Sequence, residues 1–199
     1  MLLFIIIFCV PSLLLGQKPK IGTIEFLKST NGIKDIVLGA DIKTLPYSKV
    51  SCLAGDSGFD ADSCLKFAIS DSTALRIDDN LSLDMIGIRT YKNKIVNIYL
   101  FFRKADAYLI LNNFLSIYGV FTSRPFEYSN IYNWDSRAVS LSLMYQADVE
   151  DGVAVFTCSQ LANHLVEVRE MAMAKKDPQT FKTSDRSANS TILLSSTNP

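Results

Sequence analysis

Residues 84–119 constrain the fold more than any other stretch, because two alternating segments follow each other with only a short turn between them. In residues 85–91 and again in residues 95–102, successive side chains alternate between two sets of different character. A period of two predicts β-strands. The intervening residues 92–94, Lys-Asn-Lys, predict a hairpin turn, since Asn tolerates the positive φ that such turns require.

The second strand of this hairpin is expected to divide its side chains between two faces. One face would carry Val96, Ile98, Leu100 and Phe102, and the other Ile95, Asn97, Tyr99 and Phe101. A helix is predicted to follow and to end at Gly119, because glycine is the usual residue where a helix closes in a left-handed conformation. Its apolar positions include Ala105, Leu109, Leu115 and Tyr118.

The remaining chain predicts further short strands and one long helix. Strands are expected over residues 21–27, 33–38, 65–69, 74–77, 138–146 and 153–158. Asp41 is expected to cap a short helical turn before Pro46. A last helix is predicted from Ser159, with Leu161, Leu165, Val168 and Ala172 at helical spacing, although residues 164–169 also alternate and leave a strand open. These elements predict an α+β fold of two layers, an antiparallel sheet with helices packed on one face.

The ends of the chain differ in composition from its middle. Residues 1–16 form an apolar run that precedes a polar start at Gln17, which is typical of a signal peptide cleaved after Gly16; an uncleaved anchor is the alternative. Residues 17–176 are expected to form a single domain, and residues 177–199, rich in Ser, Thr and Asn, a disordered tail. The sequence therefore predicts an exported protein, periplasmic or secreted, with no stable membrane span after cleavage.

Composition excludes some partners. The formal net charge is +0 with one histidine, which gives no electrostatic case for binding nucleic acid. Near-neutrality also favours self-association. Neither a nucleotide-binding glycine loop nor a G-x-S-x-G motif occurs. The sequence therefore predicts no cofactor, and it favours a protein without catalytic activity over an enzyme.

The cysteines and acidic residues are the remaining candidates for chemistry. Cys52 and Cys64 bracket a Gly/Asp-rich loop and predict a disulfide in an oxidising compartment, with Cys158 unpaired and buried. A Cys158 nucleophile would need His164 as its base. Three acidic residues of that loop could hold calcium, but their spacing does not match an EF-hand, so a solvated loop is expected and no metal site is predicted. They are Asp56, Asp60 and Asp62.

The order of elements resembles known small exported domains. A hairpin, a helix ending in Tyr118-Gly119, an aromatic strand YNWDS and the strand VSLSLMY are similar to small exported proteins of the Bacteroidetes type, of unknown function. The layout is also similar to β-lactamase-inhibitor-like domains and to small lipoprotein domains of outer-membrane assembly. The resemblance implies a non-enzymatic domain; no lipobox cysteine is present, so a lipid anchor is not implied.

The sheet face opposite the helices is the predicted binding surface. Its mixture of aromatic, Arg, Met and small polar side chains is typical of interfaces. The expected residues are Arg89, Tyr91, Asn97, Tyr99, Phe101, Trp134, Ser140, Ser142 and Met144. The alternatives are that the aromatic residues fill the core, or that the tail or an N-terminal strand covers this face. The leading hypothesis is an exported, non-catalytic domain that binds another protein or a small ligand; the alternatives are a small secreted or envelope hydrolase and an inhibitor of a secreted enzyme.

Overall fold

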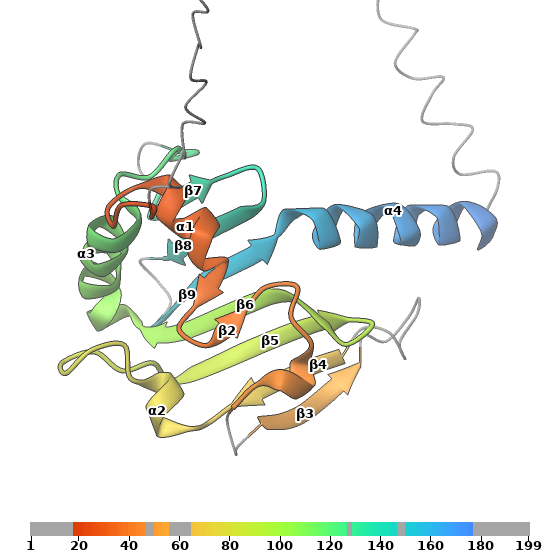
Figure 1. The fold of residues 1–199 in the computed structure, drawn as a ribbon, viewed down its shortest axis with the longest axis horizontal. Coiled ribbons are helices and arrows are strands. Elements are labelled where there is room, and N and C mark those ends of the chain that lie inside the picture. The colour runs from red at the N-terminus through yellow and green to blue at the C-terminus, as the bar shows by residue number, and fades with distance from the viewer. Residues whose placement is uncertain (1–17, 47–49, 56–64, 127–128, 147–149, 177–199) are drawn as a thin grey trace, which may run out of the picture.

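The computed structural model of the protein describes residues 18–46, 50–55, 65–126, 129–146 and 150–176. Its main element is a seven-stranded sheet with the strand order β3-β4-β5-β6-β9-β8-β7, in which all neighbouring strands are antiparallel (Figure 1). The strands are β3 (Val50–Gly55), β4 (Leu65–Ile69), β5 (Met85–Tyr91), β6 (Lys94–Arg103), β7 (Ile131–Asp135), β8 (Val139–Tyr145) and β9 (Asp151–Cys158). The predicted α+β class with an antiparallel sheet is confirmed.

Helices and short elements complete the fold. They are α1 (Ile24–Thr30), β1 (Gly32–Ile33), β2 (Ile36–Val37), the 3-10 turns η1 (Ile42–Thr44) and η2 (Lys104–Asp106), α2 (Ser72–Leu75), α3 (Ala107–Tyr118) and α4 (Ser159–Lys176). α1 and α3 pack against each other and share one core with the sheet. α4 continues from β9 and projects away from the sheet (Figure 1). No helix among the described residues is long and apolar enough to cross a membrane.

Aromatic rings fill the core between α3 and the sheet. The ring of Phe114 meets those of Trp134 and Phe156 edge-on, at centroid distances of 5.9 and 6.1 Å. Edge-to-face pairs of this kind add to the stabilisation that burial alone provides. The indole Nε1 of Trp134 donates a hydrogen bond of 2.7 Å to the carbonyl of Gly119, so the buried polar atom has a partner. Trp134 therefore ties β7 to the end of α3.

Gly119 ends α3, as predicted, at a place where a larger residue would not fit. Its φ is +80°, and a Cβ there would lie 2.5 Å from the carbonyl oxygen of Gly22. The Gly22 N–H in turn donates to the carbonyl of Ile117. Gly22, just before α1, therefore packs against the C-terminal end of α3. On α3, Leu109 was expected among the apolar positions but is 48% exposed.

Two of the predicted strands are helices instead. The strand predicted over residues 21–27 is replaced by α1, in which Asn31, in a left-handed conformation, ends the helix. Alternation of apolar residues also fits one helical turn, and here it places Ile24 and Leu27 on the same side. The strand predicted over 74–77 is replaced by α2, whose N-cap Asp71 accepts a hydrogen bond from the N–H of Thr73. A side-chain N-cap bond favours the helix in the second segment only, because Thr23 at the start of α1 makes no such bond.

Three other predictions at this level have clear outcomes. The strand predicted over residues 33–38 is instead the end of β1 (Gly32–Ile33) and the separate strand β2 (Ile36–Val37). Asp41 caps η1 as predicted, since its carboxylate accepts a hydrogen bond of 3.0 Å from the N–H of Lys43. The predicted final helix is confirmed as α4, which excludes the alternative strand over 164–169. The predicted signal peptide and the predicted tail lie outside the described residues.

The hairpin of β5 and β6 contains a bulge that the alternating pattern does not reveal. Lys92 and Asn93 both have positive φ and form the predicted turn. Arg89 pairs with Asn97, but the next residue pairs with Ile95, so Val96 is an extra residue. The predicted faces are therefore wrong at this end. Ile95 enters the main core, and Val96 joins a separate cluster with Leu165 of α4.

Candidate functional site

The sheet face opposite α1 and α3, called the open face below, carries three rows of side chains that run across the strands. Strand register defines the rows, because directly paired residues of an antiparallel sheet share a face. The apolar row contains Met85, Phe101, Val153, Met144 and Ile131. The middle row contains Ala68, Gly87, Tyr99, Val155, Ser142 and Asn133. The polar row contains Lys66, Arg89, Asn97, Thr157, Ser140 and Asp135.

Two aromatic rings stand at the centre of the open face. Tyr99 and Phe101 are both half-buried, and their rings lie nearly parallel with centroids 6.3 Å apart. Gly87, on the neighbouring strand, presents no side chain between them, which leaves a shallow pocket of about 230 Å³. Met85 lines its apolar side, and Lys66 and Arg89 line its charged side. The pocket therefore offers an apolar floor with a cationic rim.

The polar groups of the open face bond across the strands. The side-chain amide of Asn97 donates to the hydroxyl of Thr157 at 3.0 Å. The hydroxyl of Ser142 donates to the amide oxygen of Asn133 at 2.6 Å. Asp135 accepts a hydrogen bond of 3.2 Å from the hydroxyl of Thr122. These bonds hold the rows in a fixed arrangement, which reduces the ordering cost of binding a partner.

Two predicted binding residues are buried and not accessible on this surface. Trp134 is completely buried in the main core. Tyr91 follows Arg89 on the same side of β5, but it is 4% exposed because it packs in the separate cluster with Leu165 of α4, where its ring meets that of His164 edge-on at 6.0 Å. The other seven predicted residues share the open face, and Asn97 among them is 8% exposed. They are Arg89, Asn97, Tyr99, Phe101, Ser140, Ser142 and Met144.

The residues considered for chemistry do not converge in the described part of the chain. Cys158 is a free thiol but half-buried rather than buried as predicted. His164 is exposed on α4, and its Nδ1 lies 3.9 Å from a carboxylate oxygen of Glu167. The predicted disulfide between Cys52 and Cys64 lies outside the side chains that the structure describes, as do the acidic residues 56, 60 and 62. Among described residues, no three His, Cys, Asp or Glu side chains could hold a metal ion together.

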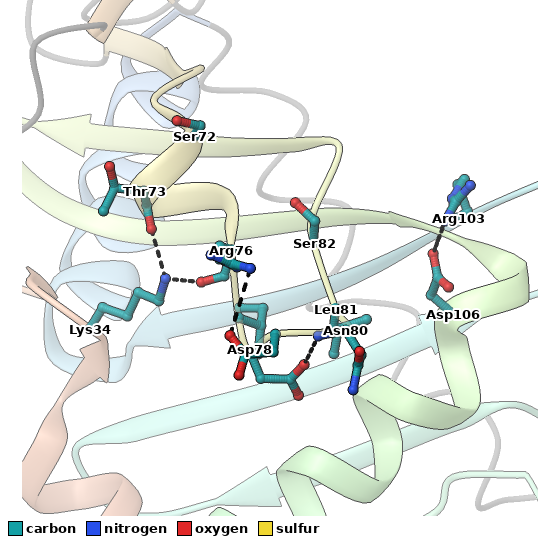
Figure 2. Close-up of a pocket in the computed structure, with 12 residues that line it drawn as sticks. Lys34, Ser72, Thr73, Arg76, Asp78, Asn80, Leu81, Ser82, Arg103 and Asp106 are labelled. Atoms are coloured by element: carbon teal, nitrogen blue, oxygen red, sulfur yellow. Dashed lines mark hydrogen bonds and ion pairs between the residues drawn. The ribbon is translucent and has the colours of Figure 1, made fainter.

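A larger, polar hollow lies at the other side of the molecule, beside α2 (Figure 2). Lys34 points into it and donates to the carbonyl oxygens at the end of α2: Thr73 at 2.9 Å, Ala74 at 3.3 Å, and Arg76. A cation at the C-terminal end of a helix interacts favourably with its carbonyls. Desolvation lowers the pKa of Lys34, and the nearby carboxylate of Asp35 opposes this shift.

The other charges of the hollow also interact within the chain. Arg76 pairs with Asp79 at 3.6 Å, and Arg103 pairs with Asp106 at 2.9 Å. The carboxylate of Asp78 accepts a hydrogen bond from the N–H of Asn80. These interactions indicate a structural role for the residues around the hollow, in which Lys34 holds the β1–β2 segment against α2. The one sequence signal for this hollow is Lys34 beside Asp35, in a tight turn where Lys34 has a positive φ.

Comparisons with protein-family models, curated proteins and solved structures found no match. The geometry of the open face is therefore the basis on which a function can be assigned. Sequence reasoning omitted several residues of the open face, namely Lys66, Met85, Gly87, Val153, Val155, Thr157, Ile131, Asn133 and Asp135. Residues 153–158 alternate in sequence, which predicts that Val153, Val155 and Thr157 share one face of a strand. Only the pairing of β9 with β6 shows that this face is the open face.

Proposed function

We propose that this chain is an exported, non-catalytic interaction domain that binds a macromolecular partner on the open face of its sheet. The observation that supports this proposal most directly is the central pair of rings, Tyr99 and Phe101, beside the pocket at Gly87. Aromatic and Met side chains supply contact area at interfaces, and small polar groups fix the register of the partner. The open face carries both kinds, in rows held by cross-strand hydrogen bonds.

A catalytic function has less support. A hydrolase of the predicted alternative kind needs a nucleophile beside a base that a third group orients. The single histidine of the chain, His164, is exposed on α4 and lies against Tyr91 and Glu167. The inhibitor alternative is a special case of the interaction proposal, since it also needs a docking surface.

Photo-crosslinking tests the proposal. Tyr99→p-benzoyl-phenylalanine keeps an aromatic ring at the centre of the open face and forms a covalent bond to whatever lies against it. Tyr108, 69% exposed on α3, is the matched control position. In the cells that produce the full chain, irradiation should give a discrete crosslinked product from position 99 and none from position 108. Equal products from both positions, or none from position 99, would count against the proposal.

Stability measurements separate contact from folding. Tyr99→Ala and Phe101→Ala should move the melting midpoint much less than Leu100→Ala, because Leu100 is 1% exposed and the two rings are half-buried. If the two ring variants lost as much stability as Leu100→Ala, the rings would be core residues and the proposal would fail. The export part of the proposal rests on residues 1–16, and intact mass of exported material that begins at Gln17 would support it.

A further inference from the structure

We infer that the partner bound by the open face is a second copy of this chain, related by a twofold axis that runs parallel to the strands between β6 and β9. This inference rests on the proposed function, since it names the partner of the same surface. The evidence is the order of the strands, the size of the side chains in each row and the placement of charge.

The three rows lie on six of the seven strands, and β3 lies beyond β4, outside the proposed interface. β4, β5 and β6 lie on one side of the axis, and β9, β8 and β7 on the other. A twofold rotation places β4, β5 and β6 over β7, β8 and β9 of the second copy, so each row meets the same row. A twofold axis across the strands would instead set the apolar row against the polar row. Sheets that pack face to face keep their strands within about 30° of each other, as the parallel axis requires.

Side chains that meet across this axis complement each other in size. In the apolar row, Phe101 would face Val153 of the second copy, and Met85 would face Met144. In the middle row, Tyr99 would face Val155, so each large ring meets a smaller side chain. Gly87 would face Ser142 of the second copy at the pocket. Apolar contact of this kind at the centre of a patch is what carries most binding energy.

The charges of the polar row also complement each other. Lys66 and Arg89 stand at its β4–β5 end, and Asp135 stands at its β7 end. Lys66 and Asp135 are both exposed. The rotation brings Lys66 of each copy opposite Asp135 of the other, so this pair forms twice in one dimer. A formal net charge of +0 adds no overall repulsion between copies.

The area is sufficient for a specific dimer. Six strands about 4.8 Å apart and three rows about 6.8 Å apart cover roughly 600 Å² on each copy. Together the two copies would bury about 1,200 Å², the lower end of the range for specific interfaces. A dimer with this area alone would be of moderate affinity and would dissociate on dilution.

Sedimentation velocity of the purified full chain, over a wide range of concentration, tests the inference with charge-swapped variants. Lys66→Glu and Asp135→Lys each create two like-charge contacts in the homodimer, so each should weaken dimerisation about tenfold or more. An equimolar mixture of the two variants should restore it, because both contacts of the mixed dimer are then attractive. Lys28→Glu and Asp35→Lys, exposed and away from the open face, carry the same charge changes and should leave dimerisation unchanged.

Any of three other results would overturn the inference. A monomer at all concentrations, a dimer that the swapped charges leave unchanged, or a mixture that does not restore association would each exclude this interface. Melting midpoints of both variants confirm that they fold, since both positions are exposed. If the chain is monomeric but position 99 crosslinks to a different protein, the inference fails and the proposed function stands. If position 99 crosslinks to nothing, both fail.

Discussion

Adjacent residues of the same strands build the two faces of this sheet, yet the faces differ in cover and in chemistry. On β6, Ile98, Leu100 and Phe102 are at most 1% exposed beneath the helices, while Tyr99 and Phe101 between them are half-buried on the open face. The core face gains its stability from tight contact within the chain. The open face keeps large rings at a position where the chain itself does not bury them. This contrast implies that the two faces respond differently to the same kind of substitution.

The largest difference should appear at adjacent residues of β7. Trp134→Ala removes a completely buried ring and its hydrogen bond to Gly119, and should cost about 3–5 kcal/mol of unfolding free energy. Asn133→Ala, one residue away on the open face, should cost about 1 kcal/mol because it removes hydrogen bonds of a half-buried side chain. Urea unfolding measures both. Equal losses would mean that the open face is as tightly packed as the core.

Two glycines provide a second comparison between the faces. A Cβ at Gly152 would lie 2.2 Å from the ring of Phe102 in the core, so Gly152→Ala should cost about 1–3 kcal/mol through overpacking. A Cβ at Gly87 would lie 3.2 Å from the ring of Phe101, which can shift on the open face. Gly87→Ala should therefore change stability by about 0.5 kcal/mol or less. Thermal melts of both variants check the pair, and a large loss at Gly87 would show that Phe101 is held in place.

The strands that form the open face could be predicted from the sequence, but the order in which they pair could not. Alternation in residues 95–102 and 138–146 predicted which side chains share a face of each strand, and the register of β5, β6, β9 and β8 places seven of the predicted residues together. Pairing between strands distant in sequence has no local signal, because it depends on contacts that form only in the folded chain. For this reason the prediction left out β9, which contributes the middle of all three rows.

The errors have local physical causes. The bulge at Val96 reverses the face of residues 95 and 96, and nothing in an alternating apolar pattern distinguishes an extra residue. Trp134 was assigned to the surface as one of several aromatic residues, although its indole N–H finds a backbone partner inside the core. Residues 21–27 alternate, but a helix begins within them at Ile24 and ends beyond them at Asn31, which is left-handed. Short apolar segments fit both helix and strand, so only tertiary contacts decide them.

Alkaline titration gives the last and smallest effect, and it reports on the core face alone. Burial raises the pKa of Tyr118 to about 12 from its ordinary value of 10.0. Since the folded state disfavours the ionised ring, its contribution to stability is fully present below pH 10 and is lost as the pH rises from 10 to 12. At pH 11 the loss from this residue should be on the order of 1 kcal/mol. Tyr118→Phe should abolish that share. A separate sensitivity persists from Tyr145, whose pKa is also raised to about 12, first by desolvation and then by its hydrogen bond with Tyr132; this residue is partly exposed, so solvent screens its share. Tyr99→Phe, on the open face, should leave the share of Tyr118 in place. Urea unfolding at pH 9 and pH 11 distinguishes the variants, and an unchanged pH dependence in Tyr118→Phe would show that ionisation of Tyr118 does not contribute to it.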